Sequence, residues 1–297
     1  MRVTEQRNPR SASLDKKSTF EILRIINRED AKVASAVRKV VPEIARAVDL
    51  AVETLAKGGR LVYLGAGTSG RLGVLDAAEC IPTFGTDQVI GVMAGAPASM
   101  FRPSEVSEDD PALGERDLRK IKFSRRDVLL GISASGRTPF VIGGLRYARR
   151  LHAATALLTA NPQAEASTFA DVSIAPVVGP EVIAGSTRMK AGTAQKLVLN
   201  MISTATMVRL GRVFSNLMVE VQLTNTKLRQ RAEGILIEST GATAGRARKA
   251  LESSGGSLPA AMVMLAKGID REGAVALLKS GRSTSEVLRR ALKKNSM

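Results

Sequence analysis

The sequence predicts an α/β protein with a doubly wound, mostly parallel sheet and a small C-terminal helical domain. Short apolar runs alternate with helical stretches up to about residue 176, which is the pattern of parallel strands joined by crossover helices. Two of these runs lead into loops rich in Gly, Ser and Thr, and from Lys190 onward the pattern becomes helical. With 297 residues, 44% of them hydrophobic, the chain has enough apolar material for a sizeable core.

The chain begins with a polar arm over residues 1–18. Asp30 then has the character of an N-cap for one long amphipathic helix, which reaches Ala56 and ends at Lys57-Gly58-Gly59. Neither the start of the chain nor any later stretch holds the apolar run of a secretory signal or of a membrane helix, which needs about 18 residues. We therefore expect a cytoplasmic protein without a membrane partner.

Five strands are expected, most of them separated by helical stretches, over residues 60–64, 88–93, 127–132, 154–159 and 171–176. A helix is expected over 139–151, with Pro139 in its first turn, where the missing N–H costs nothing. Later helices are expected over 191–210, 217–232, 243–252, 258–266, 271–280 and 284–293. The chain then divides into a main domain with a helical arm, 1–234, and a helical appendage, 235–297, to which we assign no chemistry.

The cysteine and histidine residues of a typical transition-metal site are scarce. The chain has one cysteine, Cys80, which excludes an internal disulfide and a multi-thiolate zinc site. It also has one histidine, His152, for which we expect a surface or packing role. We expect no metal and no cofactor. Acid–base chemistry must then come mainly from carboxylates, lysines or the two tyrosines.

The formal net charge of +16 suggests nucleic-acid binding, because Lys and Arg supply the electrostatic part of that binding. The basic residues are spread along the chain, however, and the aromatic content of 3% is too low for base-stacking platforms. We therefore expect no nucleic-acid partner. A basic surface would still attract an anionic substrate.

Two loops follow apolar runs and are the strongest functional signal, namely Gly65-Ala66-Gly67-Thr68-Ser69-Gly70-Arg71 and Ser133-Ala134-Ser135-Gly136-Arg137-Thr138. Loops that leave the carboxyl ends of parallel strands meet at one edge of the sheet, and each opens a helix whose first N–H groups attract phosphate. Neither loop has the Lys-Ser/Thr ending of a nucleotide-binding P-loop, and no acidic ribose partner is evident. A small phosphorylated metabolite is therefore favoured over a nucleotide.

Several motifs together resemble the N-acetylmuramic acid 6-phosphate etherases, bacterial members of the sugar isomerase (SIS) domain superfamily. The resemblance covers essentially the whole chain and is carried by residues 4–8, 25–30, 59–73, 76–80, 82–85, 133–139 and 185–196. It implies cleavage of the D-lactyl ether at carbon 3 of N-acetylmuramic acid 6-phosphate, giving N-acetylglucosamine 6-phosphate and D-lactate in cell-wall recycling. The family's route is elimination from the open-chain sugar followed by hydration. This needs a base at carbon 2 and an acid at the departing oxygen.

Two glutamates match the family's acid and base positions. Glu79 is implied to be the proton donor to lactate and the activator of water. Glu108 is implied to be the base for the carbon 2 proton, although a glutamate in an acidic run such as 105–110 is ordinarily a solvated charge. Glu79 stands among apolar and small residues, so we expect it to be desolvated, with its pKa raised towards that of a working acid.

The resemblance also implies a set of phosphate ligands, Ser69, Ser133, Ser135 and Thr138, with Thr68 beside them. Arg71 and Arg137 either join this set or face solvent. Ser186 and Lys190 either line the same crevice or serve helix packing.

The sequence departs from the family at Ile81, where proline is usual, and over residues 96–103, which precede Glu108. A regulatory sugar-phosphate-binding protein without turnover, like the related glucokinase regulatory protein, is the alternative function, and an isomerase is a third. Both glutamates argue against the regulatory reading. The apolar helix at 191–210 exceeds what one sheet face needs, so we expect a homodimer with crevices near the subunit boundary.

Overall fold

The computed structural model describes residues 3–102 and 105–292, which form two compact units. The first unit comprises Met1–Ala78 and Gln88–Ala205, and the second comprises Glu79–Asp87 and Thr206–Met297. The expected domain boundary after residue 234 stays a prediction. In the described part of the chain, no helix is long and apolar enough to span a membrane.

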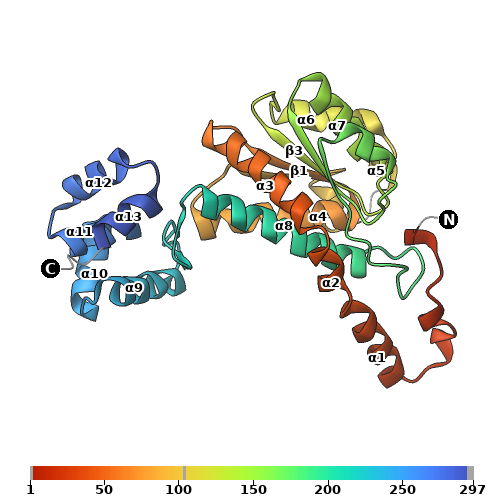
Figure 1. Ribbon diagram of the computed structural model, residues 1–297, viewed down its shortest axis with the longest axis horizontal. Helices are drawn as coiled ribbons and strands as arrows, with labels where there is room; N and C mark the ends of the chain where they lie inside the picture. The colour runs from red at the N-terminus through yellow and green to blue at the C-terminus, as the bar shows by residue number, and fades with distance from the viewer. Residues whose placement is uncertain (1–2, 103–104, 293–297) are drawn as a thin grey trace. The chain divides into compact units, whose positions relative to one another are not determined.

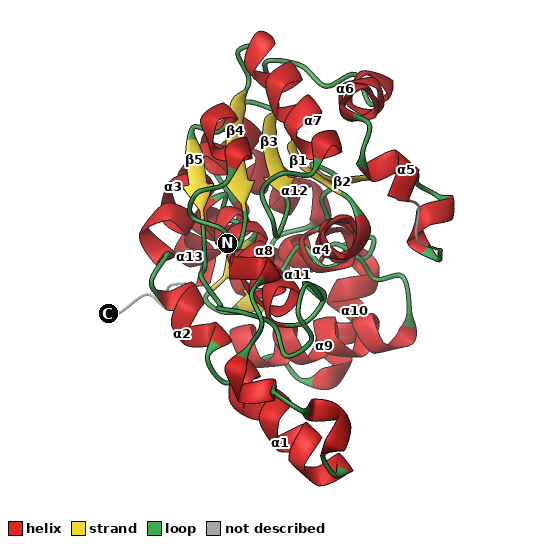
Figure 2. Cartoon of the chain, turned by 90° about the vertical axis from the view of Figure 1, so that its right-hand side faces the viewer, coloured by secondary structure: helices red, strands yellow, loops and turns green. Residues whose placement is uncertain are grey.

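The first unit is built on a parallel five-stranded sheet of order β2-β1-β3-β4-β5, as Figure 2 shows. All five expected strands are confirmed: β1 (Leu61–Gly65), β2 (Val89–Met93), β3 (Val128–Ile132), β4 (Ala154–Leu158) and β5 (Val172–Ile174). Every residue of β1 and β3 is buried, as expected for parallel strands covered on both faces. At the carboxyl edge Gly65 pairs with Met93 on one side and Ile132 on the other, so the loops after β1 and β3 leave from neighbouring positions.

Helices cover both faces of this sheet (Figure 1). One face carries α6 (Pro111–Lys120) and α7 (Pro139–Arg150), and the other carries α3 (Val41–Ala56), α4 (Gly67–Phe84) and α8 (Lys190–Arg209). The apolar side of α7 is fully buried against the strands at Phe140, Val141 and Leu145. Burial of this kind contributes about 1.5–3 kcal/mol for each large side chain, which fixes α7 and the loop before it.

The N-terminal helices begin and end at other residues than expected. Three short 3-10 turns over Val3–Glu5, Pro9–Ser11 and Leu14–Lys16 precede α1 (Thr19–Asp30), α2 (Val33–Arg38) and α3. Ser18 is the N-cap of α1, because its hydroxyl accepts from the Glu21 N–H while the Glu21 carboxylate accepts from the Ser18 N–H. Asp30 therefore ends a helix, and the prediction that it begins one long helix to Ala56 is wrong.

In its described residues the second unit holds a two-stranded hairpin, five complete helices and the ends of α4 and α8. Residues 217–218 form β7 (Leu217–Met218), paired with β6 (Val213–Phe214), and α9 (Thr226–Thr240) begins only after its N-cap Asn225. The expected helix over 217–232 is therefore wrong in its first half. The last four expected helices are present as α10 (Ala244–Ser253), α11 (Leu258–Lys267), α12 (Arg271–Ser280) and α13 (Thr284–Leu292). Together with α9 they enclose a separate apolar core that includes Leu236, Met262 and Leu288.

Candidate functional site

The first loop turns sharply from β1 into α4 and depends on two glycines. Gly67 has φ +52°, a conformation that favours glycine. A Cβ on Gly70 would lie 2.6 Å from the carbonyl oxygen of Gly65, so the chain could not fold back this closely with any larger residue. Thr68 and Ser69 stand between these glycines in the first turn of α4, where helix N–H groups face outward.

The second loop gathers its three predicted ligands into one hydrogen-bonded group. The Ser133 hydroxyl lies 2.8 Å from that of Thr138 and 3.4 Å from that of Ser135. The Gly136 N–H donates to Ser133 and the Arg137 N–H donates to Ser135. The loop thus holds three hydroxyls together at the start of α7, whose N-cap is Thr138.

Glu108 lies between the two loops. It ends the short helix α5 (Glu105–Glu108), and its Oε1 accepts a hydrogen bond from the Thr138 hydroxyl at 3.2 Å. Its other oxygen, Oε2, is 3.9 Å from the position that a Cβ on Gly67 would occupy. The structure therefore brings Glu108 together with both predicted phosphate loops, even though residues 96–103 differ from the family pattern.

Arg71 holds the segment that leads towards Glu108. Its guanidinium donates to the carbonyl oxygens of Ser99 (2.6 Å) and Met100 (3.0 Å). Arg71 is thus bound to this segment rather than turned to solvent, whereas Arg137 is exposed.

Glu79 is exposed, so the expectation that it is desolvated is wrong. The reason is its place on α4: Asp76, Ala77 and Cys80 take the buried side of the helix, and Glu79 falls outside it. Sequence composition around a helical residue does not indicate which face of the helix is covered. Glu79 is in the segment that belongs to the second compact unit.

Two polar networks around the first loop were not predicted from the sequence. Buried Asp76 accepts from the Tyr63 hydroxyl on β1 at 2.9 Å and from the Asn200 amide on α8 at 2.7 Å, which joins sheet, α4 and α8. On the same side, Ser69 donates to Oε1 of Gln195 at 3.0 Å. Each pair is far apart in the sequence, so no local pattern reveals it.

Lys190 forms a buried ion pair and has a structural role in packing. Its side chain is 1% exposed, and its Nζ donates to Glu29 at 2.7 Å. Burial opposes the charge on Glu29, but hydrogen bonds from Lys190, Lys32 and Asn8 outweigh it and lower the pKa of Glu29 to about 2. Burial raises the pKa of Glu181, which accepts the N–H groups of Lys190 and Ala191 at the start of α8. Ser186 is half-buried in the loop that precedes this helix.

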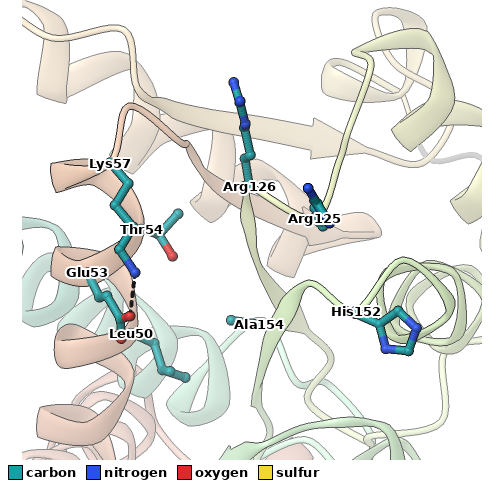
Figure 3. Close-up of a pocket in the computed structure, with 8 residues that line it drawn as sticks. All are labelled: Leu50, Glu53, Thr54, Lys57, Arg125, Arg126, His152 and Ala154. Atoms are coloured by element: carbon teal, nitrogen blue, oxygen red, sulfur yellow. Dashed lines mark hydrogen bonds and ion pairs between the residues drawn. The ribbon is translucent and has the colours of Figure 1, made fainter.

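A pocket of about 580 Å³ lies at the amino ends of the strands, away from the two loops. Figure 3 shows its lining, in which Lys57 at the end of α3 is turned towards Glu53, with which it pairs at 2.6 Å. Exposed His152, as expected a surface residue, stands in this lining with Arg125 and Arg126. In the described residues, no group of His, Cys, Asp or Glu side chains is arranged to hold a metal ion.

Known proteins match the chain along nearly its whole length. N-acetylmuramic acid 6-phosphate etherase of Pectobacterium atrosepticum is 54% identical over 279 residues, which are 93% of this chain and 92% of that protein. The protein of the same name from Yersinia pestis is 53% identical over 274 residues, covering 92% and 93% of the two chains. Family models match residues 43–149 (glucokinase regulatory protein N-terminal SIS domain) and 99–205 (SIS domain).

Solved structures support the fold alone. A putative phosphosugar isomerase involved in capsule formation, from Bacteroides fragilis, has a TM-score of 0.50 at 22% identity, covering 71% of this chain and 96% of that one. Phosphoheptose isomerase from Neisseria gonorrhoeae has a TM-score of 0.50 at 18% identity, covering 64% and 98%. The fold expected from the sequence, including its SIS domain, is confirmed.

Proposed function

The chain belongs to the N-acetylmuramic acid 6-phosphate etherase family, and we propose that it performs this reaction with the two loops and Glu108 at the carboxyl edge of the sheet. It is a carbon–oxygen lyase that cleaves the D-lactyl ether to give N-acetylglucosamine 6-phosphate and D-lactate in cell-wall amino-sugar recycling. The relatives support this activity over a regulatory sugar-phosphate-binding protein without turnover.

The loops bind the 6-phosphate. Ser133, Ser135 and Thr138 supply hydroxyl donors, and the first turns of α4 and α7 supply N–H groups with positive partial charge. Thr68 and Ser69 complete this set from the first loop. The high positive charge of the chain favours the approach of such an anion.

The position of Glu108 is the single observation that carries the mechanism. In the free chain its carboxylate accepts the Thr138 hydroxyl proton, so a sugar bound by its phosphate on the same loop is within reach of a base. When the phosphate takes that proton from Thr138, the Glu108 carboxylate is free to accept another. Glu108 removes the proton from carbon 2 of the open-chain aldehyde. The electron pair forms the double bond between carbons 2 and 3, and the carbon 3–oxygen bond breaks.

Glu79 gives its proton to the departing lactate oxygen. The carboxylate that results then takes a proton from water as the water adds to carbon 3, while carbon 2 regains a proton. Overall one water is consumed and one ether bond is cleaved, so the step needs no oxidant or reductant.

A second copy of the chain covers the face of α4 that carries Glu79. Leu75, one turn before Glu79 on this helix, is 49% exposed, and Phe20 and Leu23 on α1 are 68% and 59% exposed. Large apolar side chains at this exposure favour association, and a partner subunit would supply the desolvation that Glu79 lacks in one chain. We place this homodimer in the cytoplasm, because a charged sugar phosphate stays in the compartment where it is phosphorylated.

Release of D-lactate from N-acetylmuramic acid 6-phosphate tests this function. The purified wild-type chain should release lactate, and Glu108→Gln should lower the rate by about 10²–10⁴-fold, the contribution typical of a general base. Asp109→Asn is the matched control, since Asp109 is the exposed neighbour of Glu108 and should keep the wild-type rate. No lactate from the wild type would overturn the activity, and an unimpaired Glu108→Gln would overturn the assignment of the base.

A further inference from the structure

Gln195 on α8 has a hydrogen-bonding arrangement that its packing does not explain. The residue is 2% exposed, and its Oε1 accepts the hydroxyl proton of Ser69 at 3.0 Å. Its Nε2 is buried and has no hydrogen-bond partner among the described residues. Buried amide donors are almost always paired, so an unpaired one calls for a specific reason.

The same hydrogen bond conflicts with phosphate binding by Ser69. A serine hydroxyl has one proton to donate, and phosphate oxygens act as acceptors. While Ser69 donates to Gln195, its oxygen therefore has nothing to offer a phosphate. Half a turn of the amide about its last side-chain bond exchanges Oε1 and Nε2 at nearly constant volume. Nε2 then donates to Ser69, and the Ser69 proton is free.

The backbone at the start of the helix that carries Gln195 is held by hydrogen bonds. Buried Glu181 accepts the N–H groups of Lys190 (3.0 Å) and Ala191 (2.9 Å), which holds the first turn of α8. In the same turn, a Cβ on Gly192 would lie 3.4 Å from the Thr68 methyl group, so α8 packs directly against the first loop.

We propose that Gln195 is a positioning residue that sets the direction of the Ser69 hydrogen bond when the sugar phosphate binds. In the free chain Ser69 donates to Gln195. In the complex the Gln195 amide presents Nε2 to Ser69, and Ser69 donates to a phosphate oxygen. The buried donor that is unpaired in the free chain gains its partner in the complex, and the amide oxygen takes the unpaired position. This inference rests on the proposed function, because it takes Ser69 to be a phosphate ligand.

Gln195→Glu is the most direct test, because an ionised carboxylate keeps the shape of the amide and can only accept. Ser69 would stay locked onto residue 195, and the added negative charge would oppose the phosphate. The dissociation constant for N-acetylglucosamine 6-phosphate, measured by calorimetry, should rise about 10- to 100-fold near pH 8. It should recover as the pH falls, since a protonated carboxyl group can again donate to Ser69. A role in packing alone would not produce this recovery.

A double-mutant cycle separates action through Ser69 from a general effect. Gln195→Met removes both amide atoms at similar length, and Ser69→Ala removes the hydroxyl. If Gln195 acts only through Ser69, the double variant should bind the product no more weakly than Ser69→Ala does. Thr206→Val is the control, because the Thr206 hydroxyl is also buried on α8 with no hydrogen-bond partner in the described part of the chain and should be dispensable for binding.

These outcomes are separable from failure of the proposed function. Lactate release by the wild type tests the activity, whereas the cycle tests Gln195, and thermal unfolding of every variant identifies loss of fold. Additive losses in the cycle, or a Gln195→Glu affinity that does not depend on pH, would overturn the inference even in an active enzyme.

Discussion

Replacing Lys190 with methionine tests whether the buried ion pair with Glu29 stabilises the start of α8. Both side chains are almost fully buried, at 1% and 3% exposed, and their charged atoms are 2.7 Å apart. Methionine keeps most of the length of lysine without its charge. It would leave the Glu29 carboxylate in the interior with hydrogen bonds from Asn8 and Lys32 and an ion pair with exposed Arg10.

The magnitude follows from the pKa of Glu29, which is lowered from 4.5 to about 2. Such a difference between unfolded and folded chain corresponds to about 3 kcal/mol of stability, to which Lys190, Lys32 and Asn8 all contribute. Lys190→Met should therefore lower the free energy of unfolding by at most about 3 kcal/mol near pH 7, because a loss of about 3–5 kcal/mol applies to a buried charge left without any partner. Urea unfolding of the full-length chain measures this loss.

The loss should depend on pH with a defined sign. Because the folded chain holds the pKa of Glu29 below its unfolded value, the stabilisation is complete above about pH 4.5 and disappears as the pH falls to about 2. The difference between wild type and Lys190→Met should therefore shrink over this range. Lys57→Met is the control, because Lys57 and Glu53 form an exposed pair, 72% and 67% exposed, that should contribute little. Equal losses in the two variants at pH 7 would refute the reasoning.

Three further predictions concern the site. Ser135→Ala and Thr138→Val should each raise the Michaelis constant about 10- to 100-fold, because a hydrogen bond to a charged group contributes about 1.5–3 kcal/mol. Unchanged Michaelis constants in both variants would show that these residues do not bind the phosphate. In deuterated solvent, Glu79→Gln should stop lactate release but still exchange the carbon 2 hydrogen, whereas Glu108→Gln should lose both activities. Mass spectrometry of the sugar measures the exchange, and exchange by Glu108→Gln would mean that another residue is the base. Leu75→Glu should shift the sedimentation of the chain from dimer to monomer, because it places a charge at an exposed apolar position of α4. A wild-type chain that sediments as a monomer at micromolar concentration would contradict the dimer.

The strands and the two loops could be predicted from local sequence because their signals are local. A parallel strand covered on both faces must be apolar throughout, as Leu61–Gly65 and Val128–Ile132 are, and the hydroxyl residues of 133–138 follow such a strand directly. The start of helix α1 could also have been predicted from the sequence. Ser18 and Glu21 form a capping box in the sequence, and the weaker signal at Asp30 led to the wrong boundary. The strand Leu217–Met218 has only two residues, which is too short to show the alternating hydrophobic pattern of a strand.

The sequence by itself determined the fold class, the family resemblance and the residues that could bind a phosphate, because each of these depends on residues that are close together in the sequence. Only the tertiary structure decided which of them meet. Ser69 and Gln195 are 126 positions apart, and Lys190 and Glu29 are 161 apart. Glu108 reaches Thr138 from a separate helix, while Glu79 falls on the uncovered side of α4. Contacts of this range depend on how whole helices pack on the sheet, and the free energy of that packing comes from buried surface that no short segment contains.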